Sequence, residues 1–216
     1  MEFDKFAKEY GEYNIIQKKI IKENLKFVRN RVIDLGCGSE GLCKYKNFKF
    51  YLGIDKSENM LKSNPCYVKQ MDFDKEETFE YLSDLDFEQI VSFSALQWSK
   101  DLKKVFKNIK NLNKEYLLAI FTSNTFKTLH NYLGFNSPIY SKEEILNYAE
   151  VLNPNIKTLN YTLTFKTPID MLNYIKFSGV RKGYANVARL KKFIKNYPFN
   201  FLEFEVIVLK SCNHLH

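Results

Sequence analysis

The 216-residue sequence is poor in cysteine, glycine and proline, with 4 Cys, 8 Gly and 5 Pro spread along the chain. Cys37, Cys43, Cys66 and Cys212 form no CxxC pair and no cluster with histidine. We therefore expect neither a disulfide framework nor a structural zinc site, and we predict no metal site. Because no repeat or Pro/Gly-rich linker interrupts the chain, residues 1–216 are predicted to form a single domain.

Long apolar runs are also missing. The longest apolar stretches, such as 116–121, are far shorter than the roughly 18 residues that a membrane helix needs, and the first thirty residues are rich in charge. We expect no membrane span, no signal peptide and no membrane partner. Together with the unpaired cysteines, this predicts a cytoplasmic protein.

Arginine is scarce, since 4 Arg stand against 29 Lys in a chain of net charge +8. A positive charge can attract nucleic acid, anionic lipid or an acidic protein. Arginine is the residue expected for planar recognition of phosphates and bases, so its scarcity argues against a nucleic-acid partner. Charge alone does not decide between the other two.

Hydrophobic residues make up 45% of the chain, enough for a substantial core, and their spacing alternates between two periods. After a helix within 14–28, the pattern predicts strands at 32–35, 50–54, 67–71, 89–93 and 116–121, with helices at 57–62, 76–83 and 101–110 between them. This alternation favours βαβ units around a parallel sheet. Further on, the pattern predicts helices at 125–133 and 141–149, a strand at 156–165, two helices within 168–195 and a strand at 199–209. The last two strands are expected to pair antiparallel at an edge.

The segment Val32–Leu35 runs into Gly36 and Gly38, where backbone can approach a ligand that a side chain would block. Seventeen residues after Gly38, a second strand ends in Asp55. A carboxylate in that place can accept hydrogen bonds from both hydroxyls of a ribose. The two features together predict a nucleoside-binding site.

The run from Gly36 to Gly41 also fits the G-x-G-x-x-G spacing of dinucleotide-binding proteins. Glu40, however, places a negative charge where a pyrophosphate would lie, which disfavours a dinucleotide and is compatible with a cationic cofactor. The bland alternative is an ordinary strand-to-helix turn with an acid facing the core.

Asp34-Leu35-Gly36-Cys37-Gly38 resembles motif I of class I S-adenosylmethionine-dependent methyltransferases, and Asp55 falls where their ribose-binding acid lies. The resemblance continues in 70–73, which match the adenine loop, and in 87–92. It differs at Glu40, where the family has a third glycine, and at 113–115, where most members have a Pro-Gly-Gly turn. It implies that S-adenosyl-L-methionine is the cofactor, held by Asp34, Gly36, Cys37, Gly38, Asp55, Lys56, Met60, Asp72, Phe73 and Ser92.

The same resemblance implies an α/β, Rossmann-like fold with a mostly parallel seven-stranded sheet, an antiparallel last strand and a helical insertion before it. Residues 1–28 would then be N-terminal lid helices, 29–123 the cofactor-binding core, 124–195 the part with substrate-side helical insertions, and 196–216 the last strand and tail.

Several segments resemble one branch, the malonyl-acyl-carrier-protein O-methyltransferases of biotin synthesis (the BioC family). These are residues 3–10 with Gln17, 94–98, 122–129 and 167–184. The resemblance implies methylation of the free carboxylate of a malonyl group on acyl-carrier protein or coenzyme A. No residue would act as acid or base, because a carboxylate is already ionised near neutral pH. The acceptor would be positioned by Tyr10, Gln97, Trp98 and Arg181, with Phe3 and Phe6 closing over the donor.

Three alternatives remain open at this point. A methyltransferase of small-molecule carboxylates would use the same core, and a tRNA methyltransferase would suit the basic charge. A protein that binds the cofactor without catalysis is the third. The sequence has no appended RNA-binding module and no Asn/Asp-Pro-Pro-aromatic motif for base amines, which disfavours the tRNA enzyme.

Overall fold

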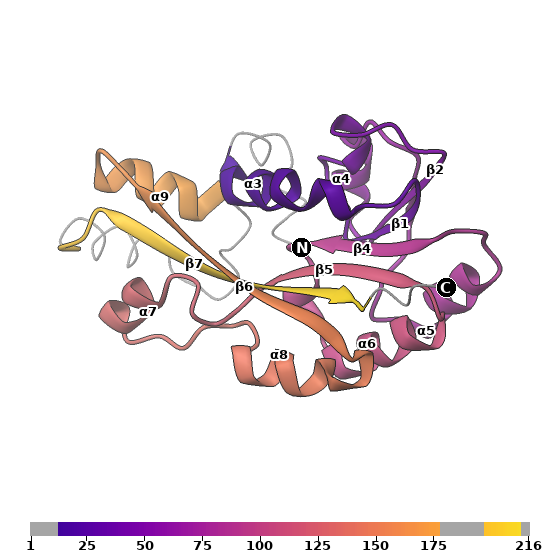
Figure 1. The fold of residues 1–216 in the computed structure, drawn as a ribbon. Coiled ribbons are helices and arrows are strands. Elements are labelled where there is room, and N and C mark those ends of the chain that lie inside the picture. Colours follow the sequence, from indigo (N-terminus) through magenta and orange to yellow (C-terminus); the bar gives the residue numbers. More distant parts are fainter. Residues whose placement is uncertain (1–12, 178–196, 213–216) are drawn as a thin grey trace.

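The computed structural model describes residues 13–177 and 197–212. A seven-stranded sheet crosses the middle of the molecule, with helices against both of its faces (Figure 1). The strands are β1 (Arg31–Leu35), β2 (Phe50–Asp55), β3 (Val68–Gln70), β4 (Gln89–Phe93), β5 (Glu115–Phe121), β6 (Pro154–Thr164) and β7 (Phe201–Ser211). The α-helices are α3 (Ile15–Asn24), α4 (Glu58–Lys62), α5 (Glu76–Ser83), α6 (Leu102–Asn111), α7 (Lys127–Leu133), α8 (Lys142–Ala149) and α9 (Pro168–Phe177). Short 3-10 helices are η1 (Leu25–Phe27), η2 (Leu42–Lys44), η3 (Leu96–Trp98) and η4 (Glu150–Leu152).

The strands lie in the order β3-β2-β1-β4-β5-β7-β6. Neighbours among β1 to β5 are parallel, whereas β7 is antiparallel to both β5 and β6. The predicted fold class, including the antiparallel last strand, is confirmed. Because the first five strands run the same way, their last residues all lie along one border of the sheet, which we call the carboxyl edge.

The two faces of the sheet carry separate cores. On one face α3 and α9 pack against alternate strand residues such as Val32, and on the other α5, α6 and α8 pack against residues such as Ile33 (Figure 1). Helix α6 illustrates how a helix covers the sheet with one apolar side. Its residues on that side follow helical spacing and are at most 1% exposed: Leu102, Val105, Phe106 and Ile109.

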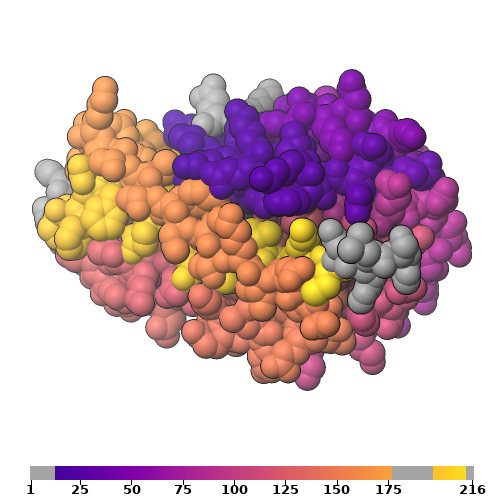
Figure 2. Space-filling model, viewed as in Figure 1, coloured from indigo at the N-terminus to yellow at the C-terminus, as the bar shows by residue number. Residues whose placement is uncertain are grey.

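Segments far apart in sequence meet on the outside of the first core. Figure 2 shows α3 lying against the surface that β6 and α9 form. The Tyr161 hydroxyl of β6 donates to Glu23 of α3 at 2.7 Å, and the Lys19 ammonium lies 5.0 Å from the centre of the Tyr161 ring. These contacts join the start of the described chain to its last third.

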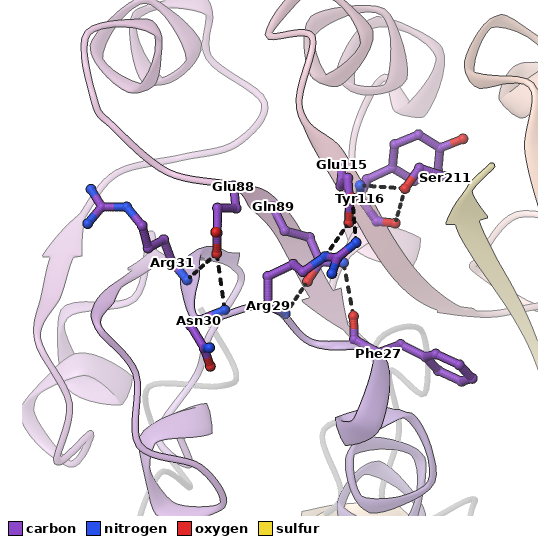
Figure 3. A network of polar contacts seen from close by, with 9 residues as sticks. All are labelled: Phe27, Arg29, Asn30, Arg31, Glu88, Gln89, Glu115, Tyr116 and Ser211. Carbon is purple, nitrogen blue, oxygen red and sulfur yellow. Dashed lines mark hydrogen bonds and ion pairs between the residues drawn. The ribbon is translucent and has the colours of Figure 1, made fainter. Parts of the chain in front are cut away.

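The opposite border of the sheet, the amino edge, is closed by a network of polar contacts (Figure 3). Arg29 donates two hydrogen bonds to the Glu115 carboxylate, at 2.8 and 2.7 Å. The Gln89 side chain accepts from the Arg29 backbone and donates to the carbonyl of Phe27, while Glu88 accepts from two backbone N–H groups at the start of β1. The network anchors the chain between η1 and β1 onto β4 and β5.

Glu115 belongs to the segment that departs from the family's Pro-Gly-Gly turn. Asn113 there has a positive φ of 51°, a left-handed conformation that asparagine tolerates better than most residues. Asn113 therefore makes the turn before β5 in this left-handed conformation.

The expectation of no disulfide is wrong. Cys43 of η2 and Cys66, in the connection between α4 and β3, form a disulfide across a sequence separation of 23. Leu42 of η2 and Cys66 belong to the same hydrophobic core, so the two segments lie on the same face of the sheet. Of the other two cysteines, Cys37 is buried and Cys212 partly exposed, and neither is in a disulfide.

The segment between β1 and β2, for which no helix or strand was predicted, contains one short element. The glycine turn is followed by η2, a three-residue 3-10 helix, and Gly41 before it has a φ of 61°. Within residues 13–177 and 197–212, no helix is long and apolar enough to cross a membrane.

Candidate functional site

The glycine turn lies at the carboxyl edge between β1 and β4. The backbone N–H groups of Gly36 and Cys37 both donate to the carbonyl of Ile54, at 2.7 and 3.1 Å, which bends the chain sharply at the end of β1. Gly36 and Gly38 have positive φ values of 73° and 56°. A side chain on Gly36 would collide with Ala95, whereas no atom lies within 4 Å of the position that a Cβ on Gly38 would take. Open space therefore lies above Gly38.

Asp55 closes β2 directly beside this turn. Its Oδ2 accepts from the backbone N–H of Gly38 at 3.1 Å, and its Oδ1 accepts from that of Ser57 at 2.9 Å. The side chain is half-buried, so the carboxylate is both fixed and accessible. A fixed carboxylate beside an open glycine turn suits the two hydroxyls of a ribose.

A side-chain amide holds the turn from its other side, which sequence reasoning missed. Asn64 donates from Nδ2 to the carbonyl of Gly38 at 2.8 Å, and its Oδ1 accepts from the backbone N–H of Cys66 at 2.9 Å. The Cys43–Cys66 disulfide lies in the same place, and a side chain on Gly41 would collide with the Cys66 sulfur. No pattern in the sequence signals these contacts, since they join separate loops.

Asp34 lies one strand residue before the turn and is 4% exposed. Its Oδ2 accepts a hydrogen bond from the Tyr51 hydroxyl at 2.9 Å. Burial raises the pKa of this carboxyl from its usual value to about 7, the Tyr51 hydrogen bond acts to lower it, and the nearby charge of Asp55 raises it. Asp34 thus differs from Asp55 in lying deep beneath the turn.

The next predicted residues form a wall beside the turn. Met60 and Phe73 are 4% and 6% exposed, and Phe73 approaches within 3.4 Å of the Cβ position at Gly36. The Lys56 ammonium lies 5.7 Å from the centre of the Phe73 ring, and Asp72 accepts from the backbone N–H of Asp74. These residues line up along the ends of β2 and β3, where an apolar wall could contact a base.

Two predicted cofactor residues are more deeply placed. The Ser92 hydroxyl is fully buried and donates to the carbonyl of Leu35 at 2.7 Å, which ties β4 to the end of β1. Cys37 is 9% exposed, and burial raises the pKa of its thiol well above the usual value. Its side chain faces Gly53, since a Cβ there would lie 2.8 Å from the Cys37 sulfur. The Cys37 backbone, not its thiol, belongs to the turn.

The exit of β4 borders a cavity. Ser94 takes a positive φ of 63°, which is unusual for serine and turns the chain into η3. Gln97 is 4% exposed; its Nε2 donates to the carbonyl of Ser94 at 2.7 Å, and its Oε1 has no hydrogen-bond partner in the described part of the chain. A cavity of about 400 Å³ is lined by Gln97, Trp98, Ser99, Ser137, Pro138, Ile139, Tyr140 and Glu144.

A second cavity, of about 360 Å³, shares Ser137, Ile139 and Glu144 with the first and extends to the exit of β5. It is bordered by Lys127 and His130 of α7, and burial lowers the pKa of His130. The loop between α7 and α8 thus separates two adjoining hollows, a contribution that the sequence did not reveal. Of the four residues predicted to position an acceptor, the structure brings Gln97 and Trp98 together here, while Tyr10 and Arg181, like Phe3 and Phe6, lie outside the described residues.

Glu40, which departs from the family motif, lies in the segment between the turn and η2. Its carboxylate pairs with the ammonium groups of Lys18 and Lys44, each at 3.4 Å. Since η2 is a single 3-10 turn, it offers no α-helix N-terminus of the kind that binds a pyrophosphate. The short 3-10 turn disfavours a dinucleotide, whereas the two ion pairs compensate the Glu40 charge on which the sequence argument rested. Within residues 13–177 and 197–212, no group of three or more His, Cys, Asp or Glu side chains could hold a metal ion.

Comparison with known proteins agrees with this geometry. Residues 33–116 match the family model described as a methyltransferase domain, a range that runs from β1 to the start of β5. A solved phosphoethanolamine N-methyltransferase of Haemonchus contortus, in complex with S-adenosylhomocysteine, has the same fold, with a TM-score of 0.56 at 16% identity. The match covers 91% of this chain and 53% of that one, so this chain spans about half its length. Residues 33–116 thus carry a methyltransferase domain of the S-adenosylmethionine-dependent class, and S-adenosylmethionine is the cofactor.

Three curated relatives are methyltransferases by name. A protein of Invertebrate iridescent virus 6 is 25% identical over 95% of this chain and 76% of its own length. The malonyl-acyl-carrier-protein O-methyltransferase of Bacillus anthracis is 24% identical over 69% of this chain and 66% of its own. The juvenile hormone acid O-methyltransferase of Bombyx mori is 25% identical over 88% and 79%.

Proposed function

We propose that this methyltransferase transfers the methyl group of S-adenosylmethionine to the free carboxylate of a malonyl thioester, carried on acyl-carrier protein or coenzyme A. The product would be the malonyl methyl ester that starts pimeloyl synthesis for biotin. The observation that carries the proposal is the contact between Gly36 and Ala95, which joins the glycine turn to the start of the segment that borders the cavity at Gln97 and Trp98. A donor on the turn would thus lie next to an acceptor in the cavity.

The donor side uses the residues around the turn. Asp55 would accept both ribose hydroxyls, Gly36 and Gly38 would leave room for the nucleoside, and Asp34 would face the ammonium of the methionyl part. Met60 and Phe73 would contact the adenine, with Lys56 and Asp72 at its rim and Cys37 and Ser92 supporting the turn from below. S-adenosylmethionine supplies an electrophilic methyl group on its sulfonium.

The acceptor side needs positioning more than proton transfer. A carboxylate is ionised near neutral pH, so no residue has to remove a proton before methyl transfer. Because the attack neutralises two opposite charges, the step gains from a pocket without water, and proximity and orientation can supply roughly 7 to 11 kcal/mol. Tyr10, Gln97, Trp98 and Arg181 would orient the acceptor, with Arg181 directing the carboxylate.

The names of two relatives support an acidic acceptor, since one acts on malonyl-acyl-carrier protein and the other on juvenile hormone acid. The second also favours the alternative that this chain methylates a small-molecule carboxylate. A tRNA acceptor finds no support among these relatives.

A labelling assay separates these candidates. The protein is incubated with methyl-labelled S-adenosylmethionine and, in parallel, malonyl-acyl-carrier protein, malonyl-coenzyme A, free malonate or bulk tRNA. We expect label in a malonyl thioester and its release by mild base, as for a methyl ester. Label in free malonate alone would favour the small-molecule enzyme, and label in tRNA but in neither thioester would contradict the proposal.

A further inference from the structure

Asp34 and Tyr51 form a buried pair, and the donor contacts proposed above include Asp34 but give Tyr51 no role. The two side chains lie on neighbouring parallel strands, β1 and β2, and are 4% and 8% exposed. The Tyr51 hydroxyl donates to Asp34 Oδ2 at 2.9 Å. Because the Tyr51 ring is buried, its hydroxyl has a fixed position. The hydrogen bond therefore also fixes the orientation of the Asp34 carboxyl group.

The strand register and one glycine make the pair possible. Asp34 lies opposite Gly53, two residues along β2 from Tyr51 and on the same face. A Cβ on Gly53 would lie 3.0 Å from the Tyr51 hydroxyl and 2.8 Å from the Cys37 sulfur. Glycine at this position therefore leaves room for the tyrosine to reach across to Asp34.

Among the residues that the structure describes, no cationic side chain acts on the Asp34 carboxylate. The titratable groups that act on it are Tyr51 and Asp55 of β2, with Cys37 in the turn. On its other side β4 places Val91 at the same register, and α3 contributes Ile16 and Ile20 to the same core.

The nearest charged group of the glycine segment, Glu40, is paired with Lys18 and Lys44. Burial raises the pKa of Asp34 to about 7. We therefore expect both the protonated and the ionised form in the free protein near neutral pH.

We propose that Tyr51 is a positioning residue that aims the Asp34 carboxyl group at the donor's ammonium, and that donor binding releases the Asp34 proton to solvent. The inference rests on the proposed donor site. In the exchange, a neutral carboxyl group and an ammonium become a carboxylate paired with that ammonium, and one proton passes to water. The donor's ammonium supplies the positive charge that pairs with the Asp34 carboxylate.

The sign of the pH dependence follows from linkage. Protonated Asp34 must lose its proton before it can pair with the donor's ammonium. Donor binding therefore weakens as the pH falls through the pKa that Asp34 has in the free protein. With that value at about 7, donor affinity should rise about fivefold between pH 6 and pH 7, and roughly half a proton should be released at pH 7. This range avoids titration of the donor's own amine, whose ordinary pKa is near 8.

Calorimetry in buffers of different ionisation enthalpy measures both quantities. Tyr51→Phe removes the bond that lowers the pKa of Asp34, so the variant should bind S-adenosylmethionine several-fold more weakly at pH 7 and release more of a proton. Asp34→Asn should show no proton release and a flat affinity between pH 6 and pH 7. As the matched ligand, 5′-methylthioadenosine keeps the nucleoside but lacks the amino-acid part, and its affinity should not change in either variant.

The outcomes separate the inference from the function on which it rests. Donor binding without pH dependence in the wild type would overturn the inference, and so would an equal loss of both ligands in Tyr51→Phe, which would indicate a purely structural role. If the wild type bound neither ligand, the proposed donor site itself would be wrong. Thermal unfolding of each variant verifies that it folds, and Asp34→Asn retains the Tyr51 side chain should Tyr51→Phe fail.

Discussion

Asp55 contributes to the fold and is also the residue proposed to bind the ribose. It fixes the glycine turn through Gly38 and the start of α4 through Ser57, and it remains half-exposed. Its position at the end of the second strand, close after a strand-glycine turn in sequence, was enough to single it out. Placement at the end of a strand is a local property of the sequence, which is why such residues can be found without a structure.

We expect Asp55→Ala to weaken S-adenosylmethionine binding about tenfold to a hundredfold, because charge-assisted hydrogen bonds contribute roughly 1.5 to 3 kcal/mol each and part of that is lost to water. Asp84→Ala, at an exposed position after α5, is the matched control. Binding is measured by calorimetry. An Asp55→Ala protein that binds the donor like the wild type would exclude a ribose contact.

Arg181→Ala should do the reverse of Asp55→Ala. On the proposed function it raises the KM for the malonyl substrate and leaves donor affinity nearly unchanged, because it would contact the acceptor alone. Steady-state kinetics with donor saturating, beside donor titration, measures the two effects. Wild-type kinetics in this variant would remove Arg181 from the acceptor site.

The pairing of Tyr51 with Asp34 was not predictable in the same way. Both residues are visible in the sequence, but their contact depends on the register that sets Asp34 opposite Gly53. A shift of one residue would have turned Tyr51 to the other face. Register follows from the whole sheet, so contacts between side chains on neighbouring strands need the structure.

At the scale of elements, the sequence predicted most strands and helices well, because their periodicity is strong. Helices α5 and α6 and the closing antiparallel pair β6–β7 fall within a few residues of the expected ranges. The short 3-10 helix η2, which follows the glycine turn, was not predicted. Gly41 and the covalent bond from Cys43 to Cys66 shape this segment, and both act across loops.

The disulfide between Cys43 and Cys66 should stabilise the folded protein. A crosslink across 23 residues contributes about 3 kcal/mol through the entropy of the unfolded chain. We expect Cys66→Ser to lower the free energy of unfolding by about this amount and to weaken donor binding, since the same connection anchors Gly38 through Asn64. Urea unfolding measures the first effect.

Two controls accompany this prediction. Cys212→Ser removes a cysteine outside the disulfide and should leave stability almost unchanged. A reductant should destabilise the wild type but not Cys66→Ser. Four reactive thiols in unfolded, unreduced wild-type protein would show that the crosslink does not form.

For the molecule as a whole, the net charge of +8 would speed association with the acceptor if the acceptor is bound to an acidic carrier protein. Raising the salt concentration should then increase the KM for malonyl-acyl-carrier protein more than that for malonyl-pantetheine, which lacks the protein, because salt screens exposed charges. Steady-state kinetics at low and high salt measures both. An equal effect on the two substrates would contradict docking by charge. The sequence also has a basic cluster that we expect to contribute to such docking; it lies outside the described residues and consists of Lys182, Arg189, Lys191, Lys192 and Lys195.

The lack of space for a side chain at Gly36 limits how the protein could be altered to accept other substrates. Gly36 fills its place only because it has no side chain, and Ala95, which it touches, begins the wall that leads to Trp98. A larger residue at either position would displace the other. A substitution intended to change the proposed acceptor site would therefore also disturb the proposed donor site. New specificity is better sought in the α7–α8 loop, whose Ser137 and Pro138 line the hollow from the far side.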